Sequence, residues 1–190
     1  MEATQKILAA ITAFADQAHG DQTRKYTPDR YIVHPVRVMN MCGQYSVSLP
    51  LLAAALLHDV VEDTEVSQEE IGAFLNKHLD AADVQKTIAL VVEMSEVCIK
   101  KDYPHLNRDK RKQLEIKRLA KTSPEAQTIK YADIIDNCSE ILQYDRNFGH
   151  RFLKECLAIL KAADRGNVQL RKRALETVEE GLETFKHRSA

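Results

Sequence analysis

The stretch from Leu51 to Thr64 reads LLAAALLHDVVEDT, and it places four ionisable side chains directly after seven apolar residues. We expect a buried helix over Leu49–Asp63, because Leu51–Leu57 is apolar on every face. Charged groups at the end of a buried helix cost free energy unless a cation or a polar partner compensates them. The segment therefore predicts a polar site at the end of a core helix.

The rest of the chain has the pattern of an all-α protein. Glycine and proline are sparse, and apolar residues recur every three or four positions. Helix starts are indicated at Pro35, at Ser67 with Glu70 as a capping box, and at Ser123-Pro124. Between the helices, Gly20–Val33 and Ile99–Asn107 are expected to be irregular. The expected helices are Glu2–His19, Pro35–Gln44, Leu49–Asp63, Gln68–His78, Ala82–Val97, Arg108–Lys121, Pro124–Tyr144, Arg151–Ala163 and Asn167–His187.

Length and composition limit the class of protein. With 190 residues and 44% hydrophobic residues, the chain suits one domain with a single core. A net charge of -1 gives no basic excess for nucleic acid, and the apolar run Leu51–Leu57 is too short to cross a bilayer. Four scattered cysteines predict buried, reduced thiols. We expect a cytoplasmic protein that is not exported and binds neither membrane nor nucleic acid.

Two imidazoles and two carboxylates in separate segments could bind one metal ion. His58 and Asp59 are adjacent in sequence, although such a pair alone is more often capping or surface chemistry. His34 precedes a proline that starts a helix, where a cap or a half-buried histidine is the commoner role. Asp133 lies on an apolar helix face and needs a buried partner, for which a metal would serve. Mixed nitrogen and oxygen ligands suit Mn, Fe, Zn or Co better than Ca or Mg.

Several segments, in this order, resemble the small alarmone hydrolases, which are relatives of the hydrolase domain of the RelA/SpoT proteins and include the animal Mesh1-type enzymes. The resemblance runs over almost the whole chain. The matching segments are Arg24-Lys25, YIVHP at 31–35, AALLHDVVEDT at 54–64, LEIKRL at 114–119, Ser123-Pro124, KYAD at 130–133 and Asn137.

The resemblance implies a fold, an activity and a site. The fold would be a single all-α HD domain, residues 1–190, of roughly eight to ten helices. The activity would be Mn2+-dependent hydrolysis of (p)ppGpp to GDP or GTP and pyrophosphate. The implied metal ligands are His34, His58, Asp59 and Asp133, and the residues implied to orient or activate water are Glu62 and Asp63. The residues expected to bind the nucleotide substrate are Arg24, Lys25, Tyr31, Lys117, Asn137 and Arg151.

The chain also departs from the family pattern. Tyr26–Arg30 replaces the usual glycine and proline before the tyrosine, residues 92–97 replace a Val-Thr-Lys-like stretch, and Asp136 adds a carboxylate. These changes leave two other functions open. One is an HD-fold phosphatase acting on another nucleotide, such as the 2′-phosphate of NADPH or a deoxynucleotide, and the other is a nucleotide-binding module without catalysis. A monomer and a homodimer are both compatible with the sequence.

Overall fold

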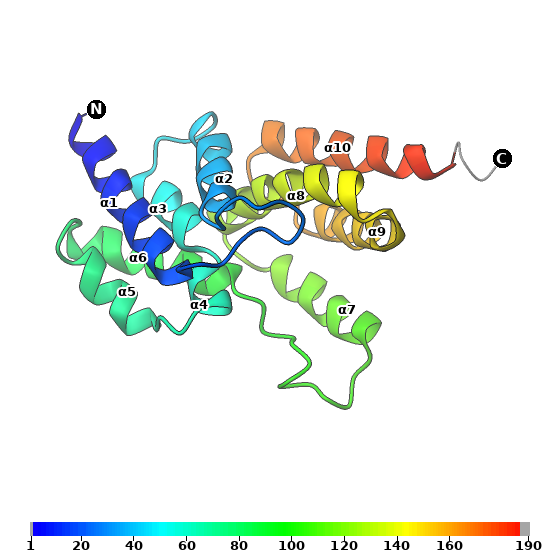
Figure 1. Ribbon diagram of the computed structural model, residues 1–190, viewed down its shortest axis with the longest axis horizontal. Helices are drawn as coiled ribbons and strands as arrows, with labels where there is room; N and C mark the ends of the chain where they lie inside the picture. The colour runs from blue at the N-terminus through cyan, green and yellow to red at the C-terminus, as the bar shows by residue number, and fades with distance from the viewer. Residues whose placement is uncertain (1, 187–190) are drawn as a thin grey trace. The chain divides into compact units, whose positions relative to one another are not determined.

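The computed structural model describes residues 2–186 (Figure 1). Within that range it contains ten α-helices and no strand, apart from one isolated bridge between Thr23 and Arg30. The predicted all-α fold is confirmed. The chain divides into two compact units, one ending at Ser95 and the other beginning at Glu96.

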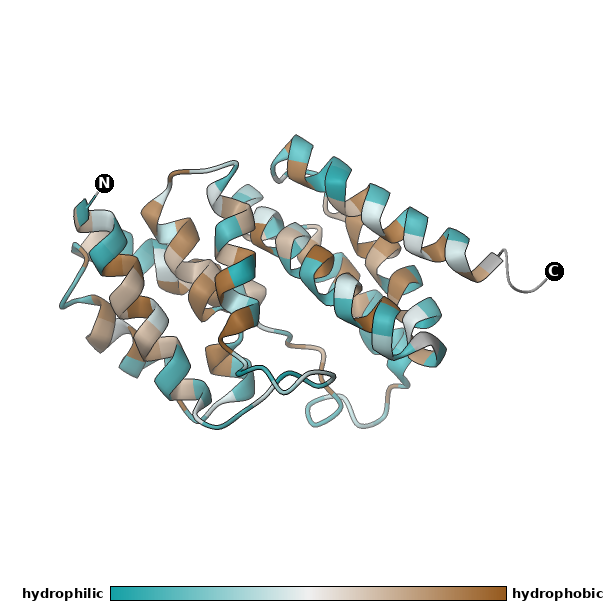
Figure 2. Ribbon diagram, turned by 45° about the horizontal axis from the view of Figure 1, so that its top comes forward, coloured by the Kyte–Doolittle hydropathy of each residue, from teal (hydrophilic) through white to brown (hydrophobic). Residues whose placement is uncertain are grey.

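The first unit is built around a short apolar helix. It contains α1 (Glu2–His19), α2 (Val33–Gly43), α3 (Leu49–Leu57), α4 (Val60–Asp63), α5 (Gln68–Leu75) and α6 (Ala81–Met94). Helix α3 packs against α1, α2 and α6, and residues 50–57 are all buried. Its apolar character is visible in Figure 2. A helix surrounded on all sides has no solvent face, which explains why this one has no polar stripe.

The helix expected over Leu49–Asp63 is wrong in one respect, because it is interrupted. Helix α3 ends at Leu57, a turn contains His58 and Asp59, and α4 restarts at Val60. The His58 ring binds the carbonyl oxygen of Ala55 through Nδ1 at 2.8 Å. In a continuing helix that carbonyl would accept from the backbone N–H of Asp59. The competition accounts for the break, which brings both polar side chains into one turn.

Helix ends in the first unit differ from expectation by a few residues. The capping box is confirmed, since Ser67 and Glu70 each accept a hydrogen bond from the other's backbone N–H. The helices expected to end at Gln44, His78 and Val97 end earlier, at Gly43, Leu75 and Met94. At the last of these, the backbone of Ser95 is extended and stops the helix.

The second unit has α8 as its buried element. It contains α7 (Arg108–Leu119), α8 (Pro124–Tyr144), α9 (Arg146–Ala162) and α10 (Val168–Lys186). Helix α8 packs against α9 and α10. The Tyr131 hydroxyl donates to the Ala163 carbonyl at 2.7 Å, which ties α8 to the segment after α9. The unit is therefore fixed by apolar packing and by buried polar contacts from α8.

Helix boundaries in the second unit also differ from expectation. Helix α7 ends at Leu119 and not at Lys121, α9 ends at Ala162 and not at Ala163, and α10 begins at Val168 and not at Asn167. Helix α9 begins at Arg146 and not at Arg151, because Asp145 Oδ1 caps it by accepting from the Phe148 N–H at 3.1 Å. The expected end of the last helix, His187, lies outside the described residues. All four cysteines are free and buried, as predicted. None of the helices in the described range is long and apolar enough to span a membrane.

Candidate active site

Three of the four expected metal ligands come together in the first unit. His34 is the second residue of α2, and His58 and Asp59 form the turn between α3 and α4. Asp59 Oδ2 lies 3.2 Å from His58 Nε2 and 3.5 Å from His34 Nε2. Metal bonds of about 2.1 Å separate two donor atoms by about 3.0 to 3.4 Å. The donor set and its spacing therefore fit one transition-metal ion.

Each of the two histidines is held by the protein. The ring of His58 donates from Nδ1 to a carbonyl oxygen, which can only accept, so in the neutral ring Nε2 keeps its lone pair on the side of Asp59. His34 is 1% exposed and its ring meets the ring of His58 edge-on, with 5.3 Å between centroids. A ligand histidine whose other nitrogen binds a carbonyl is the usual arrangement around a metal.

Tyr31 connects Asp59 with Asp63. Its hydroxyl lies 2.8 Å from Asp59 Oδ2 and 3.0 Å from Asp63 Oδ2. One hydroxyl has one hydrogen, so it can donate fully to one of these two carboxylates at a time. Burial and the nearby charge of Asp59 raise the pKa of Asp63, and burial together with both carboxylates raises the pKa of Tyr31. Asp63 is thus a carboxyl suited to exchanging a proton.

The irregular segment before α2 brings positive charge to Tyr31. The guanidinium of Arg24 lies 5.4 Å from the centre of the Tyr31 ring, and Arg24 is buried. Lys25 donates to the Tyr26 hydroxyl at 2.8 Å. Glu62, the other expected acid, is exposed on α4. All of these expected site residues lie in the first unit, together with three of the four expected metal ligands.

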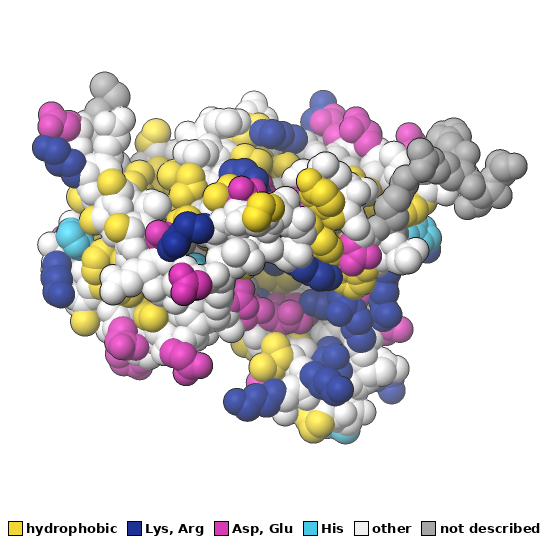
Figure 3. Space-filling model, in the orientation of Figure 1, with side chains coloured by type: hydrophobic (Ala, Val, Ile, Leu, Met, Phe, Trp, Pro, Cys, Tyr) yellow, Lys and Arg dark blue, Asp and Glu magenta, His cyan; other side chains and the backbone are white. Residues whose placement is uncertain are grey.

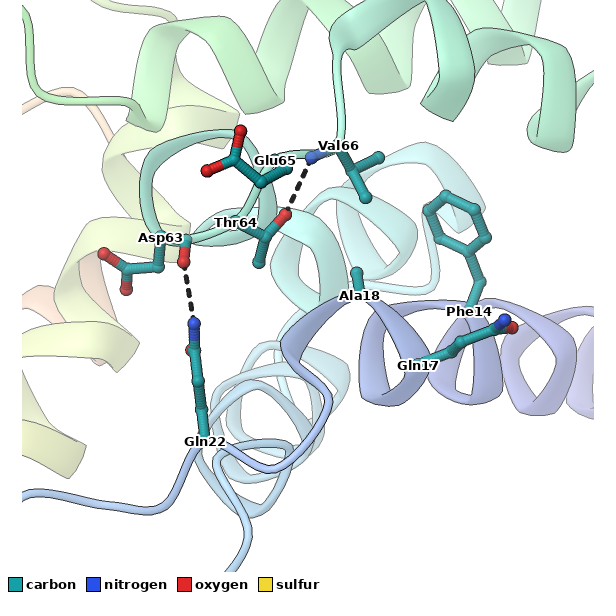
Figure 4. Close-up of a pocket in the computed structure, with 8 residues that line it drawn as sticks. All are labelled: Phe14, Gln17, Ala18, Gln22, Asp63, Thr64, Glu65 and Val66. Carbon is teal, nitrogen blue, oxygen red and sulfur yellow. Dashed lines mark hydrogen bonds between the residues drawn. The ribbon is translucent and has the colours of Figure 1, made fainter.

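His19 and Gln22 also contact this cluster, and the sequence analysis missed both. The rings of His19 and Tyr31 are stacked, with 4.3 Å between centroids. Gln22 accepts from His19 and donates to the carbonyl oxygen of Asp63 at 2.8 Å (Figure 4). A single histidine at the end of an amphipathic helix gives no signal of such a role.

A pocket of about 450 Å3 lies between the end of α1 and the segment after α4. Asp63 is the one expected site residue in its lining, and Figure 4 shows the Asp63 carboxylate turned away from Phe14 and Ala18. The full lining is Phe14, Gln17, Ala18, Gln22, Asp63, Thr64, Glu65 and Val66. The lining includes none of the three grouped metal ligands.

Asp133 and Asn137 lie in the second unit, on α8. Asp133 is buried, accepts from Asn137 Nδ2 at 2.6 Å and pairs with Lys130 Nζ at 2.7 Å. The one-turn spacing of Asp133 and Asn137 predicted a shared face, and the structure brings the two side chains into contact. Lys130 is a partner that the sequence analysis did not assign.

The two remaining expected phosphate-binding residues are exposed in the second unit. Lys117 belongs to α7, over which Lys and Arg side chains gather in Figure 3. Arg151, on α9, pairs with Asp109 at 2.5 Å and with Glu155 at 3.4 Å. Both cations are accessible to an anion, although Arg151 would have to exchange partners.

Comparison with known proteins agrees with this fold. The HD domain model matches residues 31–138, which is more than half of the chain and includes all four expected metal ligands. The chain therefore belongs to the HD domain family. A solved structure described as a metazoan orthologue of SpoT that hydrolyses ppGpp superposes with a TM-score of 0.74, at 26% identity over 93% of this chain and 96% of that one.

Among curated relatives are the MESH1 proteins, named guanosine-3′,5′-bis(diphosphate) 3′-pyrophosphohydrolases. Human MESH1 is 32% identical over 74% of this chain and 71% of its own length. Drosophila melanogaster MESH1 is 34% identical over 67% of this chain and 65% of its own length. A probable enzyme of the same name from Mycoplasma pneumoniae is 28% identical, but the chain spans only 19% of its length.

Proposed function

We propose that the protein is a metal-dependent (p)ppGpp 3′-pyrophosphohydrolase, which converts its substrate and one water molecule to GDP or GTP and pyrophosphate. The observation that carries the proposal is the close grouping of His34, His58 and Asp59 beside Asp63. The likeness to the MESH1 proteins supports the choice of substrate. The corresponding role is turnover of the stringent-response alarmone in the cytoplasm, by a monomer or a homodimer.

The proposed cofactor is one Mn2+ ion bound by His34, His58, Asp59 and Asp133. Nitrogen and oxygen ligands together suit Mn2+ and similar transition metals. The proposal of Asp133 as fourth ligand rests on the family order of motifs, and its contacts with Asn137 and Lys130 would orient the carboxylate. When bound, the metal would polarise a phosphoryl oxygen and acidify water.

Glu62 and Asp63 are the proposed acid–base residues. The raised pKa of Asp63 favours proton uptake from the attacking water, because a base works best when its pKa approaches the operating pH. The Tyr31 hydroxyl would orient Asp63 and Asp59 before the substrate arrives. Glu62 directly precedes Asp63 in α4 and is exposed, so its side chain can reach solvent and exchange its proton.

The proposed substrate contacts follow the charge of the nucleotide. Arg24 and Lys25 supply positive charge in the first unit, and Lys117 and Arg151 supply it in the second. Guanidinium and ammonium groups are the usual protein donors to phosphate oxygens. For Tyr31 and Asn137, which the family pattern assigns to the base and ribose, the observed carboxylate contacts add an orienting role.

A second candidate function is hydrolysis of another nucleotide phosphate, such as the 2′-phosphate of NADPH or a deoxynucleotide. It is favoured by the changed segment Tyr26–Arg30, in which Tyr26 holds Lys25 by a hydrogen bond and by a ring contact of 4.7 Å. A binding module without catalysis is disfavoured, because both Glu62 and Asp63 are present. A substrate panel separates these possibilities.

The test uses purified protein stripped of metal and reloaded with Mn2+. We expect pyrophosphate release from ppGpp to exceed phosphate release from NADPH or a deoxynucleotide triphosphate. Glu62→Gln should keep Mn2+ and lose turnover, whereas Asp59→Ala and Asp133→Ala should lose both. Asp136→Ala is the matched control on α8, because Asp136 is also buried but is not an expected ligand. Full Mn2+ retention in Asp133→Ala would exclude it as a ligand.

A further inference from the structure

Two residues, the buried His19 and the exposed Gln22, connect the end of α1 to Asp59 and Asp63. We infer that His19 and Gln22 are positioning residues, which fix Tyr31 and the backbone of Asp63 and through them the metal ligand Asp59. The inference rests on the proposed function, because the roles of Asp59 and Asp63 come from it. Neither His19 nor Gln22 belongs to the expected ligand, acid–base or substrate-binding sets.

The hydrogen-bond directions define a continuous connection. Gln22 Nε2 donates to the carbonyl oxygen of Asp63 at 2.8 Å, which leaves Gln22 Oε1 facing His19 Nδ1 at 3.0 Å. An amide oxygen can only accept, so His19 Nδ1 carries the hydrogen. His19 is 3% exposed, and its Nε2 has no hydrogen-bond partner within residues 2–186. The bond to Gln22 therefore sets the rotation of the His19 ring.

The backbone reinforces this connection. Gly20 has a φ of +56°, a conformation that glycine adopts without strain, and it lets the chain turn back after α1. The Gln22 N–H then donates to the His19 carbonyl, and the Tyr31 N–H donates to the Gln22 carbonyl, each at 3.0 Å. The backbone of Gln22 is thus held by His19 and Tyr31, the two residues whose rings stack on each other.

Tyr31 transmits the position of His19 to the carboxylates. The stacked His19 ring, 29° from parallel, lies against the same phenol ring that Arg24 approaches. The Tyr31 hydroxyl binds Asp59 and Asp63, so a rotated phenol would release both. Displacing reacting groups by about 1 Å can cost about 100-fold in rate. The backbone of Asp63 is held separately, by Gln22.

Gln22→Met removes both side-chain hydrogen bonds while keeping length and charge. Because Gln22 is exposed, the melting temperature should stay nearly the same. We expect kcat on ppGpp to fall by about tenfold or more, as for other residues that orient a site, with KM nearly unchanged. The matched control is Gln85→Met, which makes the same change at an exposed position of α6 and should keep wild-type kcat.

Two substitutions of His19 separate stacking from hydrogen bonding. His19→Phe keeps an aromatic ring against Tyr31 and loses only the bond to Gln22, so its kcat should fall no further than that of Gln22→Met. His19→Leu loses both contacts, and we expect about tenfold weaker binding of Mn2+ alone, measured by the loss of the free Mn2+ paramagnetic resonance signal. The double variant Gln22→Met with His19→Phe should have a kcat no lower than that of the single variant with the lower kcat. The reason is that both substitutions break the same connection, from His19 through Gln22 to Asp63.

The outcomes separate this inference from the proposed function. Mn2+ binding without ppGpp hydrolysis in the wild type, with weaker Mn2+ binding in His19→Leu, would refute the substrate and support the positioning role. Normal kcat in Gln22→Met and normal Mn2+ affinity in His19→Leu would overturn the inference and leave the function intact. If buried His19 variants fail to fold, the kcat of Gln22→Met decides by itself. A wild type that binds no Mn2+ would overturn both.

Discussion

Removing the metal should lower the thermal stability of the protein. The three grouped ligands come from α2 and from the turn between α3 and α4, so one ion would connect segments that are separate in sequence. An ion that binds the folded state and not the unfolded chain stabilises the fold by mass action. Chelation reverses this effect and changes no residue, which makes it a direct test of the metal centre.

The size of the effect follows from the affinity. At free Mn2+ about 100 times the Kd, the stabilisation is about 2.7 kcal/mol. For a chain of this length, 1 kcal/mol shifts the melting temperature by about 2 to 4 °C. Chelation should therefore lower the melting temperature by about 5 to 10 °C. The shift should also grow with Mn2+ concentration, since it depends on the logarithm of the free metal.

Differential scanning calorimetry with and without a chelator measures this shift. In His34→Gln the shift should be nearly absent, because one of the three grouped ligands is lost. The control is His78→Gln, since His78 lies in the same unit and its ring contacts that of Phe74, with 4.8 Å between centroids, outside the ligand set. A wild-type melting temperature that stays constant from chelator to millimolar Mn2+ would refute the metal centre, as would an equal shift in His34→Gln.

Three further predictions concern the fold. Gly166→Ala should destabilise the protein by about 2 to 3 kcal/mol, because the new Cβ would lie 2.5 Å from Tyr131 Cε2; an unchanged urea midpoint would contradict this. Burial raises the pKa of Cys42 to about 12, so at pH 8 the thiol stays protonated and should react with Ellman's reagent only after unfolding. Hydrogen bonds from Ser67 lower the pKa of Glu70, so their stabilisation is present above the unfolded pKa and is lost as the pH falls through the folded value. Glu70→Gln, which removes the titrating carboxylate, should flatten that acid dependence in thermal melts.

The helix boundaries that the sequence predicted well depend on local chemistry. The Ser67 capping box and the proline at the first turn of α8 act within four residues, and the structure has both helix starts where they were expected. The break between α3 and α4 was not predicted, because it depends on the rotamer of His58 and its bond to Ala55. An apolar run gives no sign of which side chain will compete for a backbone carbonyl.

The candidate site also has some residues that the sequence could predict and others that it could not. Ligand types could be recognised from motifs, since adjacent His58 and Asp59 fit one small ion. The roles of His19 and Gln22 could not, because they depend on how the chain turns at Gly20 and brings Tyr31 back onto α1. His19 and Gln22 contact Tyr31 across about ten positions of an irregular segment, and no sequence periodicity predicts contacts of that kind.

The contacts of the acidic residues change one step of the sequence argument. Buried carboxylates at Asp59 and Asp133 were expected to require a metal, because an uncompensated buried charge is costly. The structure supplies other partners: Asp59 accepts from Tyr31, and Asp133 pairs with Lys130 and accepts from Asn137. The fold can therefore form before metal binds. A site whose charges are compensated within each unit can take up and release its ion without unfolding, and in that case chelation should reduce stability reversibly.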